Sequence, residues 1–106
     1  MSKTVLFEVF EVLKSQRLVS AENEFSKDWL ARSDSYLRGL RFHDAEPSIA
    51  TMALLASKLQ YYGERLLRQK TEQHHNLGEK FLSYSQICHL KINERCVDRW
   101  QQLMAA

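Results

Sequence analysis

Between residues 32 and 43 lies a group of side chains that suits recognition of an anionic, base-paired polymer. The group consists of Arg32, Ser33, Ser35, Arg38, Arg41 and His43. A guanidinium can bind guanine O6 and N7 through two parallel hydrogen bonds, which makes Arg38 the expected base reader. Serine hydroxyls and the free N–H groups of a helix start can donate to phosphate oxygens, and the remaining cations would lie beside the phosphate backbone. The predicted chemistry is binding of double-stranded DNA.

Two further residues in this stretch bear on that prediction. Asp34 has the opposite charge, and a carboxylate that faces phosphates is repelled. We therefore expect Asp34 either to cap the following helix or to accept a hydrogen bond from a cytosine amine. Gly39 would let the backbone approach DNA closely, although glycine in a helix costs about 1 kcal/mol against alanine.

Histidines and cysteines supply the potential metal ligands and nucleophiles. These residues are His74, His75, Cys88, His89 and Cys96. Zinc sites use pairs such as C-x₂-C or H-x₃₋₅-H, whereas adjacent residues on a helix diverge by about 100° and point apart. Cys88 falls in an apolar stripe, where a thiol is usually inert. Because glycine-rich phosphate loops and G-x-S-x-G are also missing, we expect no metal, no cofactor, no small-molecule substrate and no enzymatic activity.

The elements that would position these side chains are helices, because apolar residues recur at helical spacing along the chain. We expect a first helix over 3–16 and a second over 20–31, with Ser20 as its N-cap. A short third helix is expected over 34–42, and Ser33 offers its cap. This third helix would carry most of the DNA-contacting group.

The second half of the chain predicts longer helices. Pro47-Ser48 is a good helix start, and the apolar stripe that follows can run towards Lys70. Beyond residue 71, one long helix and two helices broken near Asn93 are both open interpretations. The fold class expected is all-α: a compact helical bundle forming a single domain over 1–106, with a core over 3–70 and a helical extension over 71–106.

One stretch carries a family resemblance. Its residues are Ser33-Asp34-Ser35-Tyr36-Leu37, Leu40, Pro47-Ser48-Ile49 and Leu55-Ala56-Ser57-Lys58-Leu59. With these residues, 31–59 resembles the helix-turn-helix of the lambda-repressor-like (Cro/repressor type) family, which has the same seven-residue step from Leu40 to Pro47. At the turn, the chain has Ala31 where that family favours glycine, and Lys27 where it favours a small alanine.

The resemblance implies a small sequence-specific DNA-binding protein, a transcriptional regulator that reads the major groove with helix 34–42. Such modules bind as pairs on half-sites about 34 Å apart, so we expect a homodimer. The extension over 71–106 is the candidate dimerisation element, and closure of a monomer's core is its alternative role.

Composition is consistent with these expectations. The 106 residues include 15 basic and 13 acidic side chains, a net charge of +2. Residues 1–31 hold 4 basic and 5 acidic groups, 32–70 hold 7 and 4, and 71–106 hold 4 and 4, so the excess falls in the segment of the resemblance. Short apolar runs, two cysteines and no signal peptide favour a cytoplasmic location away from membranes.

A different class of function fits the same scaffold. The chain would then be a helical protein–protein interaction module that does not bind DNA. Asp34 and the atypical turn favour this alternative, as does the modest charge. It predicts an exposed apolar patch larger than a monomer normally leaves uncovered.

Overall fold

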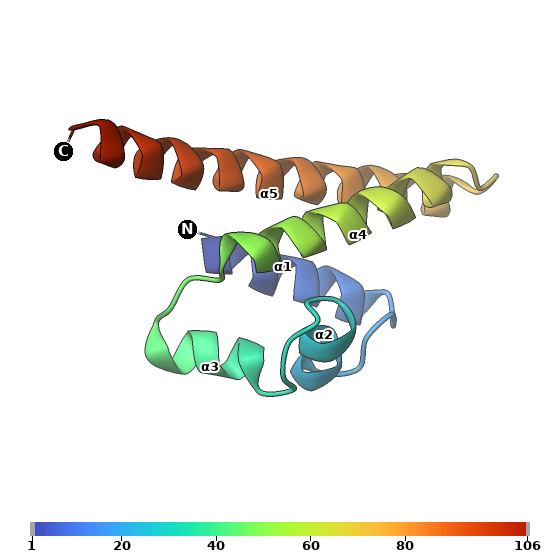
Figure 1. The fold of residues 1–106 in the computed structure, drawn as a ribbon. Helices are drawn as coiled ribbons and strands as arrows, with labels where there is room; N and C mark the ends of the chain where they lie inside the picture. The colour runs from blue at the N-terminus through green and yellow to red at the C-terminus, as the bar shows by residue number, and fades with distance from the viewer. Residues whose placement is uncertain (1, 106) are drawn as a thin grey trace.

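Five helices joined by short turns make up residues 2–105, the part of the chain that the computed structural model describes (Figure 1). They are α1 (Ser2–Ser15), α2 (Glu22–Asp28), α3 (Tyr36–His43), α4 (Ile49–Leu67) and α5 (Glu72–Ala105). The expected all-α fold class and the helical C-terminal extension are confirmed. Met1 and Ala106, the ends of the expected domain, lie outside the described residues.

The longest helices, α4 and α5, form an antiparallel hairpin with an unusually close approach. A Cβ added to Gly78 would lie 2.9 Å from the Gly63 carbonyl oxygen, and one added to Gly63 would lie 2.9 Å from Leu82 Cγ. Further along the hairpin, the buried Ser85 hydroxyl donates to the Ala56 carbonyl at 2.7 Å. Small residues therefore let the two backbones approach each other along this contact.

The hairpin is unequal in length. α5 has 34 residues and α4 has 19. At about 1.5 Å per residue, α5 spans about 51 Å, which accounts for the 53 Å long axis of the molecule. Arg95 donates to the Pro47 carbonyl just before α4 begins. Residues 96–105, which we call the α5 overhang, extend beyond that point (Figure 1).

The remaining helices complete one core beneath this hairpin. The α1 residues predicted to be apolar, including Leu6 and Leu13, are fully buried. Phe10 of α1 packs against Phe25 of α2 with ring centroids 5.7 Å apart, and Phe81 of α5 joins the same cluster. The core thus combines 3–70 with the first half of α5, rather than belonging to 3–70 alone.

The first three helices end without glycine. Arg17, Ala31 and Asp44 adopt left-handed φ values of 61°, 54° and 50° at these ends. Leu18 N donates to Leu13 O at 2.9 Å and Ala45 N to Leu40 O at 3.0 Å, the six-to-one bond of a Schellman motif. A non-glycine residue in this conformation costs about 1–2 kcal/mol. The three glycines of the chain lie within helices instead.

The expected boundaries hold for α1 and α4. Ser48 caps α4 by accepting a hydrogen bond from Thr51 N at 3.1 Å. α2 is shorter than the expected 20–31, and its N-cap is Ala21. Ser20 was therefore the wrong cap: its hydroxyl lies 2.7 Å from a Glu24 carboxylate oxygen, where it donates rather than accepts.

The open point of the second half is resolved, and the start of the third helix is corrected. α5 is one continuous helix, and Asn93 lies inside it. α3 begins at Tyr36, two residues after the expected start at 34. Within residues 2–105, no helix combines the length and the apolar character that crossing a membrane requires.

Candidate functional site

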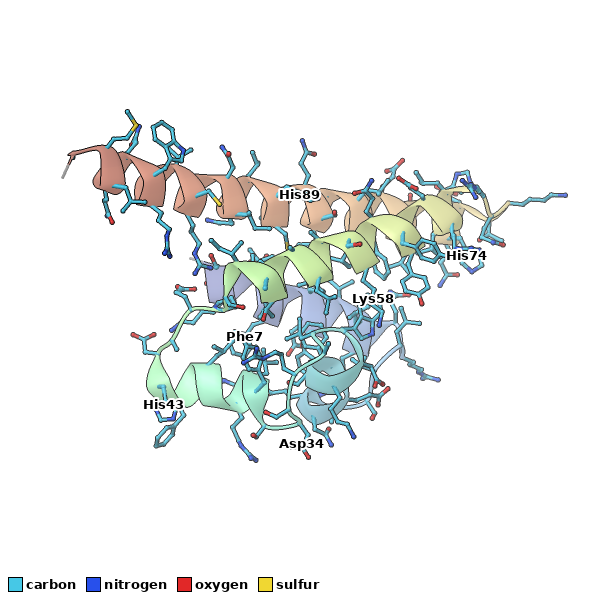
Figure 2. All side chains as sticks on the ribbon, in the orientation of Figure 1. Phe7, Asp34, His43, Lys58, His74 and His89 are labelled. Carbon is cyan, nitrogen blue, oxygen red and sulfur yellow. The ribbon has the colours of Figure 1, made fainter. Side chains whose placement is uncertain are left out.

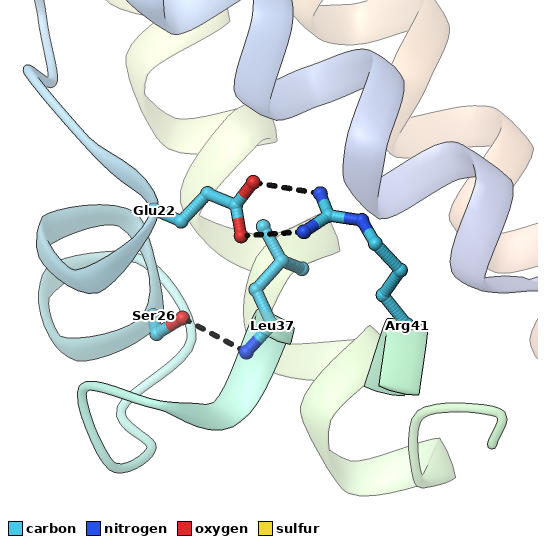
Figure 3. A network of polar contacts seen from close by, with 4 residues as sticks. All are labelled: Glu22, Ser26, Leu37 and Arg41. Carbon is cyan, nitrogen blue, oxygen red and sulfur yellow. Dashed lines mark hydrogen bonds and ion pairs between the residues drawn. The ribbon is translucent and has the colours of Figure 1, made fainter. Parts of the chain in front are cut away.

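Two polar contacts fasten α3 to α2 (Figure 3). The buried Ser26 hydroxyl accepts a hydrogen bond from Leu37 N at 3.2 Å. One turn along both helices, the Arg41 guanidinium donates to the two carboxylate oxygens of Glu22 at 3.2 and 2.6 Å. Because each helix contributes residues four apart, the contacts fix both the spacing and the rotation of α3 against α2.

Ser26 also answers two expectations about the turn. Its hydroxyl is the hydrogen-bond partner of an N–H at the start of α3, the role that was predicted for the Ser33 side chain. The N-cap of α3 is Ser35 and not Ser33. Ser33 contributes only its backbone carbonyl, which accepts from Tyr36 N at 3.1 Å. Ser26 is also the small residue that allows close packing of the two helices, whereas the neighbouring Lys27 is exposed. The small side chain is therefore one position earlier than the family pattern predicts.

The turn between the helices has the backbone conformation for which glycine is favoured. Ala31 has φ 54°, in the left-handed region. Arg32 N, directly after it, donates to Ser26 O at 2.9 Å and closes the turn. Ala31 thus adopts this conformation with a side chain present, which adds strain to the turn.

The outer face of α3 and the turn before it are open to solvent. Leu37 and Leu40 anchor α3 in the core. Five of the six predicted DNA-contacting residues are exposed and form no ion pair with any residue of 2–105: Arg32, Ser33, Ser35, Arg38 and His43. Figure 2 shows Asp34 and His43 along the side of the molecule that faces away from α4 and α5. Phe42 is 83% exposed on the same helix.

Arg41 is the member of the group that the fold already uses. Its guanidinium lies 4.7 Å from the Phe7 ring centroid in addition to its bonds with Glu22. The Glu22 hydrogen bonds raise the pKa of Arg41 above its ordinary value. The positive charge of Arg41 is therefore largely balanced, and it joins α1, α2 and α3.

Arg32 is positioned by a contact with an aromatic ring, a weaker restraint than the ion pair of Arg41. Asp34 lines a cavity at the surface. The Arg32 guanidinium lies 4.6 Å from the Tyr36 ring centroid, which steers it along the start of α3. Asp34 and Arg38 line a cavity of about 350 Å³ together with three residues at the start of α2. Asp34 therefore belongs to the surface between α2 and α3 and stands next to the expected base reader.

Sequence reasoning missed the residues that hold α3 in place. Phe7, Glu22 and Ser26 belong to helices for which only the apolar stripes were considered. A partial signal was available: Glu22 and Ser26 lie four residues apart, as do Leu37 and Arg41. Which pair faces which depends on the turn geometry, and the left-handed Ala31 gives no sequence signal for it.

The potential metal ligands are dispersed along α5. In the described range 2–105, no group of three or more histidine, cysteine, aspartate or glutamate side chains comes together. Cys88 is buried, and burial raises the pKa of its thiol to about 11. Cys96 is half-buried at the start of the α5 overhang.

The fold and the site together define a small all-α protein built on two short helices crossed at a tight turn, with a long helical hairpin behind them. A family model matches residues 6–101, and the chain belongs to that family, described as a family of unknown function (DUF6626). No match is found among curated proteins or among solved structures.

Proposed function

We propose that this protein binds double-stranded DNA through the outer face of α3 and acts as a small transcriptional regulator. The observation that carries the proposal is a short helix with one side anchored in the core and the other open. Leu37 and Leu40 are buried, while Arg38 is exposed beside the exposed Ser33 and Ser35. An α-helix presented in this way fits the major groove of B-DNA.

The exposed side chains divide into base contacts and phosphate contacts. Arg38 suits guanine, and the neighbouring Phe42, 83% exposed, suits the methyl group of thymine. Ser33 and Ser35 donate to phosphates at the start of α3, with Arg32 beside them. His43 lies at the C-terminal end of α3, where it can approach the phosphate backbone of DNA.

Arg41 contributes less to DNA than its charge suggests. Glu22 holds it in a two-bond ion pair, so its attraction for phosphates is offset by an adjacent carboxylate. The segment 32–70 carries 7 basic and 4 acidic groups, a net +3. Because non-specific affinity scales with the phosphates neutralised, one subunit has a weak electrostatic footprint. The proposal therefore includes two copies on two half-sites.

The surface that we assign to pairing with a second copy is on α5. Leu90, Val97 and Met104 recur at intervals of seven residues with Trp100 between them, the spacing of a coiled-coil seam. Leu90 is 59%, Trp100 48% and Met104 78% exposed. Residues 71–106 have 4 basic and 4 acidic groups, so two copies can meet without net repulsion. A second copy of this helix is the occupant that we propose.

A protein-interaction module without DNA binding is the second candidate, and one observation favours it. The surface next to Arg38 is hollowed rather than convex: Asp34 and Glu22 line the cavity of about 350 Å³ together with Arg38. The Glu22 carboxylate is already held by Arg41, but the Asp34 carboxylate at this place suits a basic protein segment better than phosphates.

Selection of bound sequences from random duplexes at low salt tests the proposal. A sequence preference is expected, and Arg38→Ala should then cost about 1–3 kcal/mol and relax the preference at one base pair. Lys80→Ala, which removes one positive charge from exposed α5 surface, is the matched control and should leave the preference unchanged. If no duplex shows a salt-sensitive shift, DNA binding is excluded and the interaction module stands.

A second variant tests the role of the ion pair. Glu22→Gln removes one negative charge and frees Arg41, so DNA affinity should rise alike for all sequences. The salt dependence should steepen by about one phosphate contact, a slope change of about 0.9. Arg41→Ala should weaken all sequences alike and flatten the salt dependence. If Glu22→Gln leaves both quantities unchanged, Arg41 has no part in binding.

A further inference from the structure

A cavity of about 520 Å³ opens where the end of α2 meets the α4–α5 hairpin. Its volume lies within the range of small-molecule pockets, about 300–1,000 Å³. Its walls come from α4, α5 and two non-helical segments: the connection between α1 and α2, and Trp29 directly after α2. Tyr62 belongs to the α4 wall and Phe81 to the α5 wall. The cavity lies on another part of the molecule than the outer face of α3. Figure 2 shows Lys58 beside the middle of α4 and His74 near the turn between α4 and α5.

Aromatic side chains form the apolar walls. The Trp29 ring lies 5.7 Å from the Tyr62 ring and 6.0 Å from the Phe81 ring, nearly perpendicular to the latter. Trp29 is only 8% exposed and Phe81 2%, so packing fixes both rings. Leu66 and Leu77 extend the apolar surface between them. This arrangement suits a flat apolar group, because aromatic rings favour offset and edge-to-face contacts.

The polar part of the cavity favours a negative charge. Lys58 and His74 are its basic side chains, and none of the described lining residues is an aspartate or a glutamate. The Lys58 ammonium donates to the Asp28 carbonyl and lies 5.0 Å from the Trp29 ring centroid. An ammonium has three N–H donors, so further donors remain for a ligand. Asp28 is not among the residues that line this cavity, and it lines a neighbouring hollow together with Lys58.

We propose that this cavity binds a small aromatic monocarboxylate, with the ring against Trp29, Tyr62 and Phe81 and the carboxylate on Lys58. A neutral aromatic compound would gain the same apolar contacts and lose the charge-assisted hydrogen bond. A cationic analogue would meet Lys58 with the same sign of charge. The site therefore selects by charge among molecules of equal size.

A ligand titration followed by the indole N–H signals of the two tryptophans tests this proposal on the full chain. The probes are 4-phenylbutyrate, 4-phenylbutan-1-ol and 4-phenylbutylamine. The Trp29 signal should move saturably with 4-phenylbutyrate at a Kd of about 0.1–1 mM, while the Trp100 signal stays in place. The alcohol should bind about tenfold more weakly, and the amine more weakly still. Trp100→Phe serves only to assign the two signals.

Lys58→Met supplies the decisive variant. It should weaken 4-phenylbutyrate about tenfold and leave the alcohol within about twofold, and the retained alcohol binding would show that the cavity remains formed. Lys27→Met, which removes an exposed charge on α2, is the matched control and should change neither affinity. Equal affinity for acid and alcohol, or an unchanged acid affinity in Lys58→Met, overturns the assigned carboxylate contact. No Trp29 shift at about 10 mM ligand overturns the cavity as a binding site.

Discussion

At the scale of single residues, Ser26 makes a buried hydrogen bond that fixes the position of α3 against α2. Its hydroxyl is the partner of Leu37 N at the buried start of α3. Ser26→Ala would leave that N–H without a partner and away from water, at a cost of about 1–3 kcal/mol. Urea unfolding of the variant measures this loss. Ser57→Ala on the exposed side of α4 is the control, and an equal effect of the two substitutions would show that the hydrogen bond adds nothing.

The buried Cys88 thiol should make the free energy of unfolding depend on pH, with a sign that follows from its raised pKa. Burial raises its pKa from an ordinary 9.0 to about 11 in the folded protein. Between these values the unfolded chain has lost the proton that the folded chain retains, so the free energy of unfolding must fall as pH rises. The slope reaches about 1.4 kcal/mol per pH unit for one group.

Comparing the unfolding of wild type with that of Cys88→Ala, near pH 8 and near pH 10.5, isolates this contribution, because the two proteins differ only at this thiol. The wild type should lose more stability than Cys88→Ala over this range. Equal losses would mean that the thiol titrates alike in the folded and unfolded chain.

At the scale of helices, two glycines of equal helix propensity, Gly39 and Gly78, should respond to alanine in opposite directions. A Cβ on Gly39 meets nothing within 4 Å, so Gly39→Ala should stabilise the protein by about 1 kcal/mol. A Cβ on Gly78 would lie 2.9 Å from a backbone oxygen, so Gly78→Ala should destabilise it by about 1–3 kcal/mol through overpacking. Thermal unfolding of both variants checks the pair. A stabilised Gly78→Ala would show that the hairpin is looser than described.

The helices that sequence predicted best are those with complete local signals. Pro47-Ser48 followed by an apolar stripe specified the start of α4, and Ser48 makes the expected cap. α2 was predicted too long because its end depends on Ala31, whose left-handed conformation has no sequence signature without glycine. Gly63 is a poor helix former by residue type, yet it lies inside α4 where α5 approaches closely. The role of Gly63 depends on α5, which packs against it, so the sequence of α4 alone does not reveal it.

The difference between local sequence signals and contacts of distant segments also explains how much of the candidate site could be predicted. The exposed residues Arg38, Ser33 and Ser35 follow from the amphipathic pattern of one helix, which is local information. The pairing of Arg41 with Glu22 joins residues 19 positions apart through a turn, and the pattern of each helix alone does not contain it. The cavity beside Trp29 likewise needs four segments to meet before it exists.

At the scale of the whole molecule, the two proposed interfaces lie on different parts of an elongated protein. α3 occupies the side of the body opposite α5, with α1 and α4 between them (Figure 1). The α5 overhang extends past the start of α4. Its residues 98–105 are all exposed, so this part of α5 has little of the tertiary packing from which most helical stability in proteins comes. Pairing with a second copy would supply the missing contacts while leaving both α3 faces free.

Trp100→Glu tests this arrangement, because it puts a charge into the middle of the proposed seam. In size-exclusion chromatography with light-scattering detection, the wild-type protein should have the mass of two chains and Trp100→Glu the mass of one chain. The variant should also lose most of its affinity for a duplex with two half-sites, while a single half-site is bound as before. Gln102→Glu adds the same charge on another side of α5 and should leave both properties unchanged. A wild-type mass of one chain would refute pairing through α5, and capture of a different protein at the overhang would assign that surface to a heterologous partner.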